Sequence, residues 1–317
     1  MEKYTSEEAI KAIGLSENEL ECLIRTGKKV SKASASIAGQ PNLELVFVED
    51  GAYYKVRNYC DLYPTDDEVL IKPILLNEEI DGMKKNSGWI ANLGNVDNKK
   101  ASIPKDAKKY FFSNQGLVGY PSKIEWKSAK AINEFFHRGH LMACEIICKF
   151  INPRIQGKKY YKGALERWRE NHRQSISRDT IEKLRVSRTW SNKYTMCAGN
   201  HQRHNIYTQF KQSNCANTDN STRKGQSYFE KKIVDYLESK EGEKGYVNYE
   251  VRALFKIPSD KVPRANLLCA RFYDSCGKLC RQESFCVVIP NMGSPEKDNI
   301  AKAGYKFSYE DGLEKYS

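Results

Sequence analysis

One segment of the sequence, residues 225–289, constrains the order of secondary-structure elements more than any other. Over residues 225–239, apolar side chains recur at the spacing of one helix face; they are Phe229, Ile233, Tyr236 and Leu237. Three strand-like runs follow, at residues 246–257, 266–274 and 282–289, with turn-forming residues between them. A helix followed directly by three strands predicts a fold of the α+β class.

The first hundred residues predict a smaller α+β unit. Two short helices are expected within residues 5–26, the second starting at a capping box from Ser16 to Glu19. Residues 43–48 and 53–56 predict a hairpin, and residues 69–76 a third strand. The polar stretch 86–109 predicts a linker. We therefore expect an N-terminal region of unknown role, residues 1–95, and a second domain, residues 96–317.

Charge is distributed unevenly between these regions. Residues 1–100 hold 13 Lys and Arg against 17 Asp and Glu, a net of −4, so residues 101–317 carry +16 within a chain total of +12. Such a surplus suits a polyanion-binding surface, because basic side chains neutralise phosphates and release counterions. The alternative is a surplus that only confers solubility.

Basic residues are densest at 158–188, where ten accompany four acidic ones and are interleaved with Tyr160, Tyr161 and Trp168. This mixture suits contact with a nucleic-acid backbone and unstacked bases. An equally weighted alternative is a pair of solvated amphipathic helices.

No apolar run approaches the roughly 20 residues that span a bilayer, so the sequence predicts no transmembrane segment and no membrane partner. The N-terminus lacks the basic start and apolar stretch of a secretory signal. We expect a cytoplasmic protein, or one exported without a signal of that kind.

The ten cysteines do not form the dense framework of a small secreted domain, and most are expected to be reduced. Two pairs have C-x3-C spacing, Cys144 with Cys148 and Cys276 with Cys280. A zinc site made from both pairs is one reading. A disulfide across the Cys276 turn is the favoured one.

Four of the five histidines form two pairs with i, i+3 spacing: His137 with His140, and His201 with His204. A histidine with an ordinary pKa near 6.5 accepts a proton from water at neutral pH, and Gly139 allows a close backbone approach beside it. The clustering therefore indicates general-base chemistry. Two alternatives are a histidine satisfied by core packing and a zinc site of four histidines.

Four blocks in order resemble the DNA/RNA non-specific endonuclease family, in particular bacterial DNA-entry nucleases and streptodornases. They lie between residues 119 and 312: Arg138-Gly139-His140, the run from Asn205 through Gln209 to Asn214, residues 225–230, and a tail that includes residues 249–252, 262–263 and 287–291. The resemblance implies a ββα-metal nuclease core on an antiparallel sheet, with the α+β N-terminal region before it.

The resemblance also implies a role for each matched residue. His140 would be the general base and Asn214 the metal ligand for Mg²⁺, with Mn²⁺ as an alternative. Asn205 and Gln209 would hold the base loop or the phosphate, Arg138 would contact phosphate, and Glu230 would anchor the ion's water shell. The substrates implied are DNA and also RNA, cut with little sequence preference because the site reads the backbone.

Three features depart from the family pattern: His137 stands where the family usually has Asp, residues 158–188 are inserted, and the N-terminal region matches nothing. Two alternatives follow: an inactive nucleic-acid-binding module, and an HNH-type nuclease that uses His204 with Asn205. A nuclease without a secretory signal suggests a toxin or defence effector, with an inhibitor or regulatory partner at the N-terminal region. If residues 101–317 carry the polyanion site, that fragment alone should bind and cut DNA at least as well as the whole chain.

Overall fold

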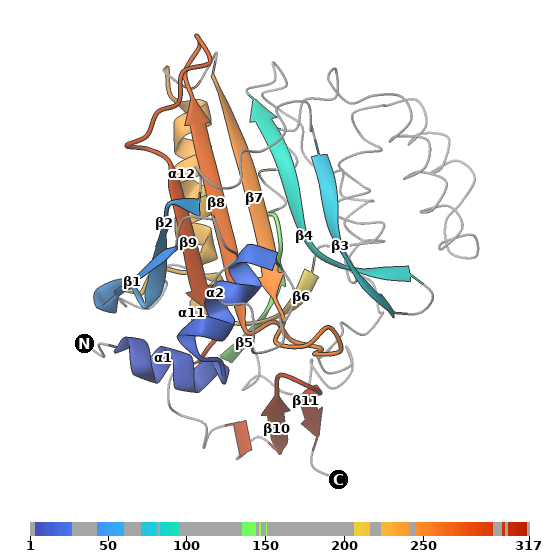
Figure 1. The fold of residues 1–317 in the computed structure, drawn as a ribbon. Helices are drawn as coiled ribbons and strands as arrows, with labels where there is room; N and C mark the ends of the chain where they lie inside the picture. Colours follow the sequence, from blue (N-terminus) through green and yellow to red (C-terminus); the bar gives the residue numbers. More distant parts are fainter. Residues whose placement is uncertain are drawn as a thin grey trace, which may run out of the picture.

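The computed structural model describes residues 4–26, 43–59, 71–80, 83–94, 135–143, 146, 150, 206–215, 223–240, 242, 245–293, 300–301 and 304–315. Their central feature is a seven-stranded sheet with the order β1-β2-β9-β8-β7-β4-β3 (Figure 1). Every neighbouring pair in it is antiparallel. The predicted α+β class with an antiparallel sheet is therefore confirmed.

The elements have the following bounds. The strands of the large sheet are β1 (Glu44–Val48), β2 (Tyr53–Arg57), β3 (Ile71–Ile80), β4 (Met83–Gly94), β7 (Tyr246–Leu254), β8 (Ala265–Tyr273) and β9 (Phe285–Pro290). Two small antiparallel sheets pair β5 (Phe136–His140) with β6 (Ile206–Phe210), and β10 (Tyr305–Ser308) with β11 (Gly312–Lys315). The described helices are α1 (Ser6–Ile13), α2 (Glu17–Thr26), the 3₁₀ turn η1 (Glu49–Gly51), α11 (Lys211–Asn214) and α12 (Gln226–Glu238).

The two N-terminal helices start where the sequence predicts. Thr5 and Glu8 form a reciprocal capping box at α1, which satisfies two backbone N–H groups that the first turn leaves without partners. The same exchange caps α2: Ser16 N–H donates to the Glu19 carboxylate (2.9 Å), and Glu19 N–H donates to Ser16 Oγ (3.2 Å). Gly14, at a φ of 63°, provides the left-handed residue that ends α1.

Strand β4 corrects the predicted linker at residues 86–109. Residues 83–94 pair with β3 on one side and β7 on the other, and Trp89, Ala91 and Leu93 are buried on one face. Gly88 resembles a turn residue in the sequence, but it is needed inside the strand because a Cβ there would overlap the backbone of Val251. Residues 95–109 lie outside the described residues.

The other strand predictions are confirmed, with small shifts at their ends. The β1–β2 hairpin turns through η1, and the residue with positive φ is Ala52 rather than Gly51.

The disulfide predicted across the Cys276 turn is wrong, because Cys276 and Cys280 are both free thiols. The Asp274 carboxylate instead closes this turn by accepting from the N–H groups of Cys276 and Lys278, both at 2.9 Å.

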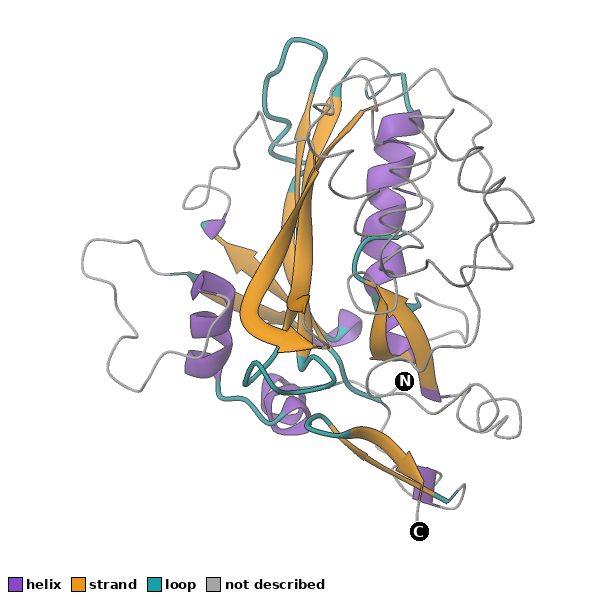
Figure 2. Ribbon diagram, turned by 90° about the vertical axis from the view of Figure 1, so that its right-hand side faces the viewer, coloured by secondary structure: helices purple, strands orange, loops and turns teal. Residues whose placement is uncertain are grey.

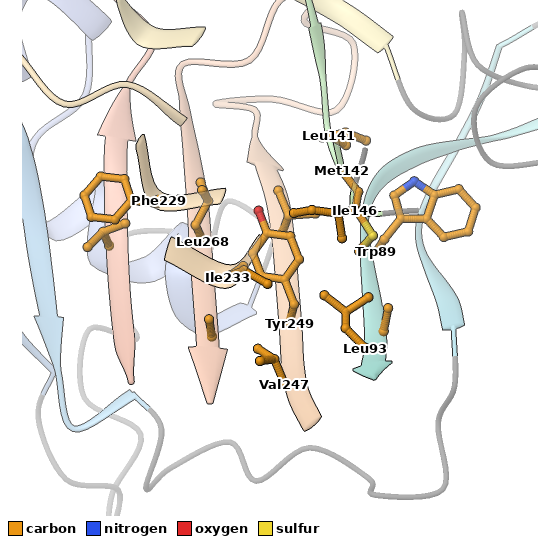
Figure 3. Close-up of a cluster of buried hydrophobic side chains, with 14 of the residues drawn as sticks. Trp89, Leu93, Leu141, Met142, Ile146, Phe229, Ile233, Val247, Tyr249 and Leu268 are labelled. Atoms are coloured by element: carbon orange, nitrogen blue, oxygen red, sulfur yellow. The ribbon is translucent and has the colours of Figure 1, made fainter. Parts of the chain in front are cut away.

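Helices cover both faces of the large sheet, so the described core around this sheet has two parts. Helix α12 lies on one face and helices α1 and α2 lie on the other (Figure 2). Side chains alternate accordingly. Val247 and Tyr249 of β7 point into the α12 core (Figure 3), and Val251 belongs to the same core, while Glu250 and Arg252 point the opposite way. Leu141, Met142, Ile146 and Phe150 also pack into the α12 core.

The sheet crosses the boundary predicted between residues 95 and 96. Strands β1 to β4 precede that boundary and β7 to β9 follow it, yet all seven belong to one sheet. Strand β2 pairs with β9, and β4 pairs with β7. The acidic N-terminal region is therefore part of the central fold.

A buried ionic network fixes this arrangement on the face that carries α2. Arg252 forms an ion pair with Glu250 (2.8 Å) and donates to Tyr59 Oη (2.7 Å) and to the carbonyl of Ile24 in α2. Tyr59 in turn donates to Glu250 (2.9 Å). Burial opposes the charge of Arg252, but Glu250 and Tyr59 outweigh it and the pKa of Arg252 lies above its ordinary value.

Candidate functional site

The candidate site is built on the antiparallel pair β5–β6. His137 is opposite Gln209 and Gly139 is opposite Tyr207. Two of the sequence blocks, the one that ends at His140 and the one that contains Gln209, therefore share one small sheet. A side chain at Gly139 would overlap Gln209, which is fully buried. Glycine is therefore required for Gln209 to lie across β5.

An aromatic cluster supports this small sheet. The rings of Phe136 and Phe210, opposite each other on β5 and β6, have centroids 4.4 Å apart. Phe307 of β10 packs on both rings, at 5.1 and 5.0 Å. The C-terminal hairpin β10–β11 thus helps to hold the strand that carries His137 and His140.

Helix α11 continues directly from β6 and is anchored to the end of β9. Ser213 Oγ donates to the carbonyl of Pro290 (2.8 Å), and Asn291 Oδ1 accepts from the N–H of Phe210 (2.8 Å). Gly225, the N-cap of α12, passes so close to Cys215 that a Cβ would lie 2.9 Å from its backbone carbonyl. These contacts fix the end of α11, and with it Asn214, against the start of α12.

Gln226, the first residue of α12, connects the site to the large sheet. Its buried amide nitrogen donates to the carbonyls of His140 (2.7 Å) and Leu141 (2.8 Å). Its amide oxygen accepts from Asn266 of β8 (3.1 Å) and Tyr207 of β6 (3.3 Å). The backbone that follows β5 is therefore held by a side chain rather than by a strand partner.

Glu230, one turn further along α12, holds the next part of the same backbone. Its Oε1 accepts from the N–H of Ala143 (3.0 Å), from Gln226 (3.1 Å) and from Tyr249 Oη (3.3 Å). Burial and then the Glu230 carboxylate raise the pKa of Tyr249 well above its ordinary value, so its hydroxyl stays protonated and keeps donating. These hydrogen bonds join Glu230 to the backbone that follows β5 and to Tyr249 of β7.

His140 occupies the last position of β5 and is half-buried. Burial disfavours the charged imidazolium and lowers the pKa of His140 to about 4. The ring is therefore neutral at physiological pH and has a lone pair available to accept a proton.

His137, Asn214 and Cys215 meet beside the small sheet. His137 Nδ1 lies 3.2 Å from Asn214 Nδ2 and 3.3 Å from Cys215 Sγ, and Asn214 Nδ2 lies 3.8 Å from that sulfur. All three side chains are half-buried. Asn214, the predicted metal ligand, thus contacts His137.

Several predicted residues and segments are not positioned by the structure. Asn205, His201, His204, Cys144, Cys148 and residues 158–188 lie outside the described residues, and the side chain of Arg138 is likewise not described. The four-histidine zinc site and the HNH-type assignment therefore stay predictions. Within the described part of the chain, no group of three or more His, Cys, Asp or Glu could hold a metal ion.

Sequence reasoning missed four contributors: Cys215, Gln226, Asn266 and Asn291. Gln226 and Asn291 lie inside the quoted blocks, but nothing in their spacing indicates that they bind backbone groups of β5 and β6. Asn266 is a buried amide within an apolar strand, a pattern that signals a specific hydrogen-bonding role.

No helix in the described residues is long and apolar enough to cross a membrane.

No protein-family model matches the chain, and no curated protein matches it. Among solved structures, it is similar to NucA from Streptococcus agalactiae with magnesium ion bound, at a TM-score of 0.46 and 16% identity over 96% of this chain and 99% of that one. The structure of NucA from the same organism with no metal bound gives a TM-score of 0.44 and 17% identity, over 86% of this chain and 91% of that one. A likeness this distant carries no functional argument, so function is argued from the chain's own residues.

Proposed function

We propose that the protein is a metal-dependent endonuclease of the ββα-metal type that hydrolyses phosphodiester bonds of DNA and RNA. The supporting observation is the element order β5–β6–α11–α12, which brings the His137–His140 strand to the end of the helix that carries Asn214. Gln226 and Glu230 then fix the backbone directly after His140. A histidine base and a hard oxygen ligand on neighbouring elements are a donor set suited to this reaction.

The described residues fit a weakly held Mg²⁺ ion. Asn214 is half-buried at the end of α11, and its amide oxygen is the type of hard, neutral ligand that Mg²⁺ accepts while keeping most of its water. Bound there, the ion would polarise the phosphodiester and stabilise the departing oxygen. Mn²⁺ has the same ligand preference and is the proposed alternative.

The chain's own groups would act around this ion. Neutral His140 would take the proton from the attacking water, with its backbone held in place by Gln226. Gln209 has a buried amide oxygen without a hydrogen-bond partner, and it sits opposite His137, where it would orient the loop that carries the base. Arg138 and Asn205 stay proposed phosphate contacts.

Plasmid and RNA degradation in Mg²⁺, with EDTA as the control, tests this proposal. The His140→Ala variant should lose about 10² to 10⁴ in rate while keeping nucleic-acid affinity, because a general base makes no phosphate contact. Asn214→Ala should need more Mg²⁺ for the same rate. Parent protein that binds DNA but cuts neither substrate would leave the inactive binding module as the function, and full activity in His140→Ala would move the base elsewhere.

A further inference from the structure

The cluster of His137, Asn214 and Cys215 contains two ligands that Mg²⁺ does not favour. Imidazole and thiolate suit softer transition metals, whereas Mg²⁺ prefers oxygen. Their atoms lie 3.3 Å apart, His137 Nδ1 to Cys215 Sγ, although the residues are 78 positions apart in the chain. The fold therefore joins a nitrogen and a sulfur donor beside the proposed Mg²⁺ ligand.

The three separations match one face of a tetrahedral zinc site. With Zn–S of about 2.3 Å and Zn–N of about 2.0 Å, tetrahedral angles separate sulfur from nitrogen by about 3.6 Å. The cluster shows 3.3 Å for that pair, and the Asn214 amide nitrogen lies 3.2 Å from His137 Nδ1 and 3.8 Å from Cys215 Sγ. A half turn of the amide about its Cβ–Cγ bond would present oxygen as the third donor.

The surrounding contacts hold the donors close to this geometry without a metal ion. The N–H of Cys215 donates to the carbonyl of Lys211 (2.8 Å), and Gly225 packs against the Cys215 backbone. Pairing with Gln209 of β6 fixes the His137 backbone. Little conformational freedom would therefore be lost on binding, which favours affinity.

We propose that His137 Nδ1, Cys215 Sγ and the amide oxygen of Asn214 bind a thiophilic divalent ion such as Zn²⁺, which competes with Mg²⁺ for Asn214 and inhibits the nuclease. On binding, the Cys215 thiol loses its proton to solvent and the thiolate becomes the ligand. Water fills the fourth position. The inhibition rests on the proposed function, but the binding of the ion does not.

Binding is tested on the full chain without nucleic acid, with Co²⁺ as a spectroscopic probe and Zn²⁺ as the competitor. A cobalt–thiolate bond gives a strong near-ultraviolet charge-transfer band, which Cys215→Ser should lose. Both Cys215→Ser and His137→Ala should weaken Zn²⁺ binding by at least about 10- to 100-fold. The matched control is Cys276→Ser, because Cys276 is an exposed thiol in the β8–β9 turn and should leave both signals unchanged.

The outcomes separate this proposal from the proposed function. If Cys215→Ser and His137→Ala, shown to be folded by circular dichroism, bind Co²⁺ and Zn²⁺ as the parent does, the site is wrong whatever the nuclease activity. If the parent cuts DNA in Mg²⁺, Zn²⁺ should inhibit it, and half-inhibition of Cys215→Ser should need at least about tenfold more Zn²⁺. If the parent shows the cobalt band, Cys215→Ser loses it, and the parent never cuts DNA, then the metal site is supported and the proposed nuclease function is rejected.

Discussion

The two faces of strands β7 and β8 carry buried polar networks of different kinds. On the face covered by α1 and α2, the network is ionic and joins Arg252 and Glu250 to Tyr59 and α2. On the α12 face it is built from amides and one carboxylate, and Gln226 and Glu230 hold the backbone after His140. The first network joins N- and C-terminal segments, whereas the second positions a short strand. We therefore expect the ionic network to govern stability and the amide network on the α12 face to govern activity.

The largest effect should come from deleting residues 1–94. This removes four of the seven strands of the sheet and all of α1 and α2. The remaining fragment should fail to fold and should not cut DNA, contrary to the expectation that the charge distribution suggests for residues 101–317. Circular dichroism and thermal unfolding measure this directly. A soluble fragment with a cooperative transition would show that the ionic face is dispensable.

Breaking the ion pair on the same face should be the next largest effect. Arg252→Met leaves the Glu250 carboxylate buried without its cation and should lower the free energy of unfolding by about 3 to 5 kcal/mol. Adding Glu250→Leu should recover part of this loss, because the double variant buries no charge without a partner. Urea unfolding measures both. Equal stability of single variant and parent would mean that the pair is dispensable.

On the α12 face, Gln226→Ala should affect activity more than stability. The change leaves the carbonyls of His140 and Leu141 without their donor and should cost about 1 to 3 kcal/mol. The proposed nuclease activity should fall further than the unfolded fraction explains, because the backbone of the proposed general base, His140, is no longer held. The matched control is Asn248→Ala, a buried amide of β7 on the other face, which bonds Asn92 at 2.6 Å. Activity losses of equal size would remove the distinction between the faces.

The smallest effect should be a pH dependence of stability from His140. Its pKa is about 4 in the folded protein and near 6.5 when exposed, so the unfolded chain binds more protons between these values. Stability should therefore fall as pH decreases from about 6.5 towards 4. In His140→Gln, the free energy of unfolding should differ less between pH 7 and pH 5 than it does in the parent. An unchanged difference would show that the ring is solvated.

Local patterns predicted the elements but not how they combine. The apolar spacing of α12, the capping box of α2 and the strands β7 to β9 are encoded within short windows, so sequence reasoning found them. Strand β4 was missed because Asn86 and Gly88 resemble turn residues, and only the approach of Val251 explains the glycine. The assignment of residues 1–95 to a separate region failed to anticipate that both β1–β2 and β3–β4 pair with C-terminal strands.

For the site, the sequence supplied candidates but not their contacts. His137 and Gln209 were proposed on separate grounds, and their register on β5–β6 now places them opposite each other. The contact of His137 with Cys215 joins residues in distant parts of the chain, so no local spacing could reveal it. The roles of His140, Asn214 and the other proposed residues await the experiments above.

The interleaving of early and late strands has a consequence for synthesis on the ribosome. Strands β2 and β4 are made first, but their partners β9 and β7 follow only after a long stretch of chain. Contacts so distant in sequence form slowly, and here they cannot form before β7 and β9 have been synthesised. Asn266 and Asn291, which hold Gln226 and β6, emerge from the ribosome equally late. A nascent or prematurely terminated chain would thus lack the assembled candidate site.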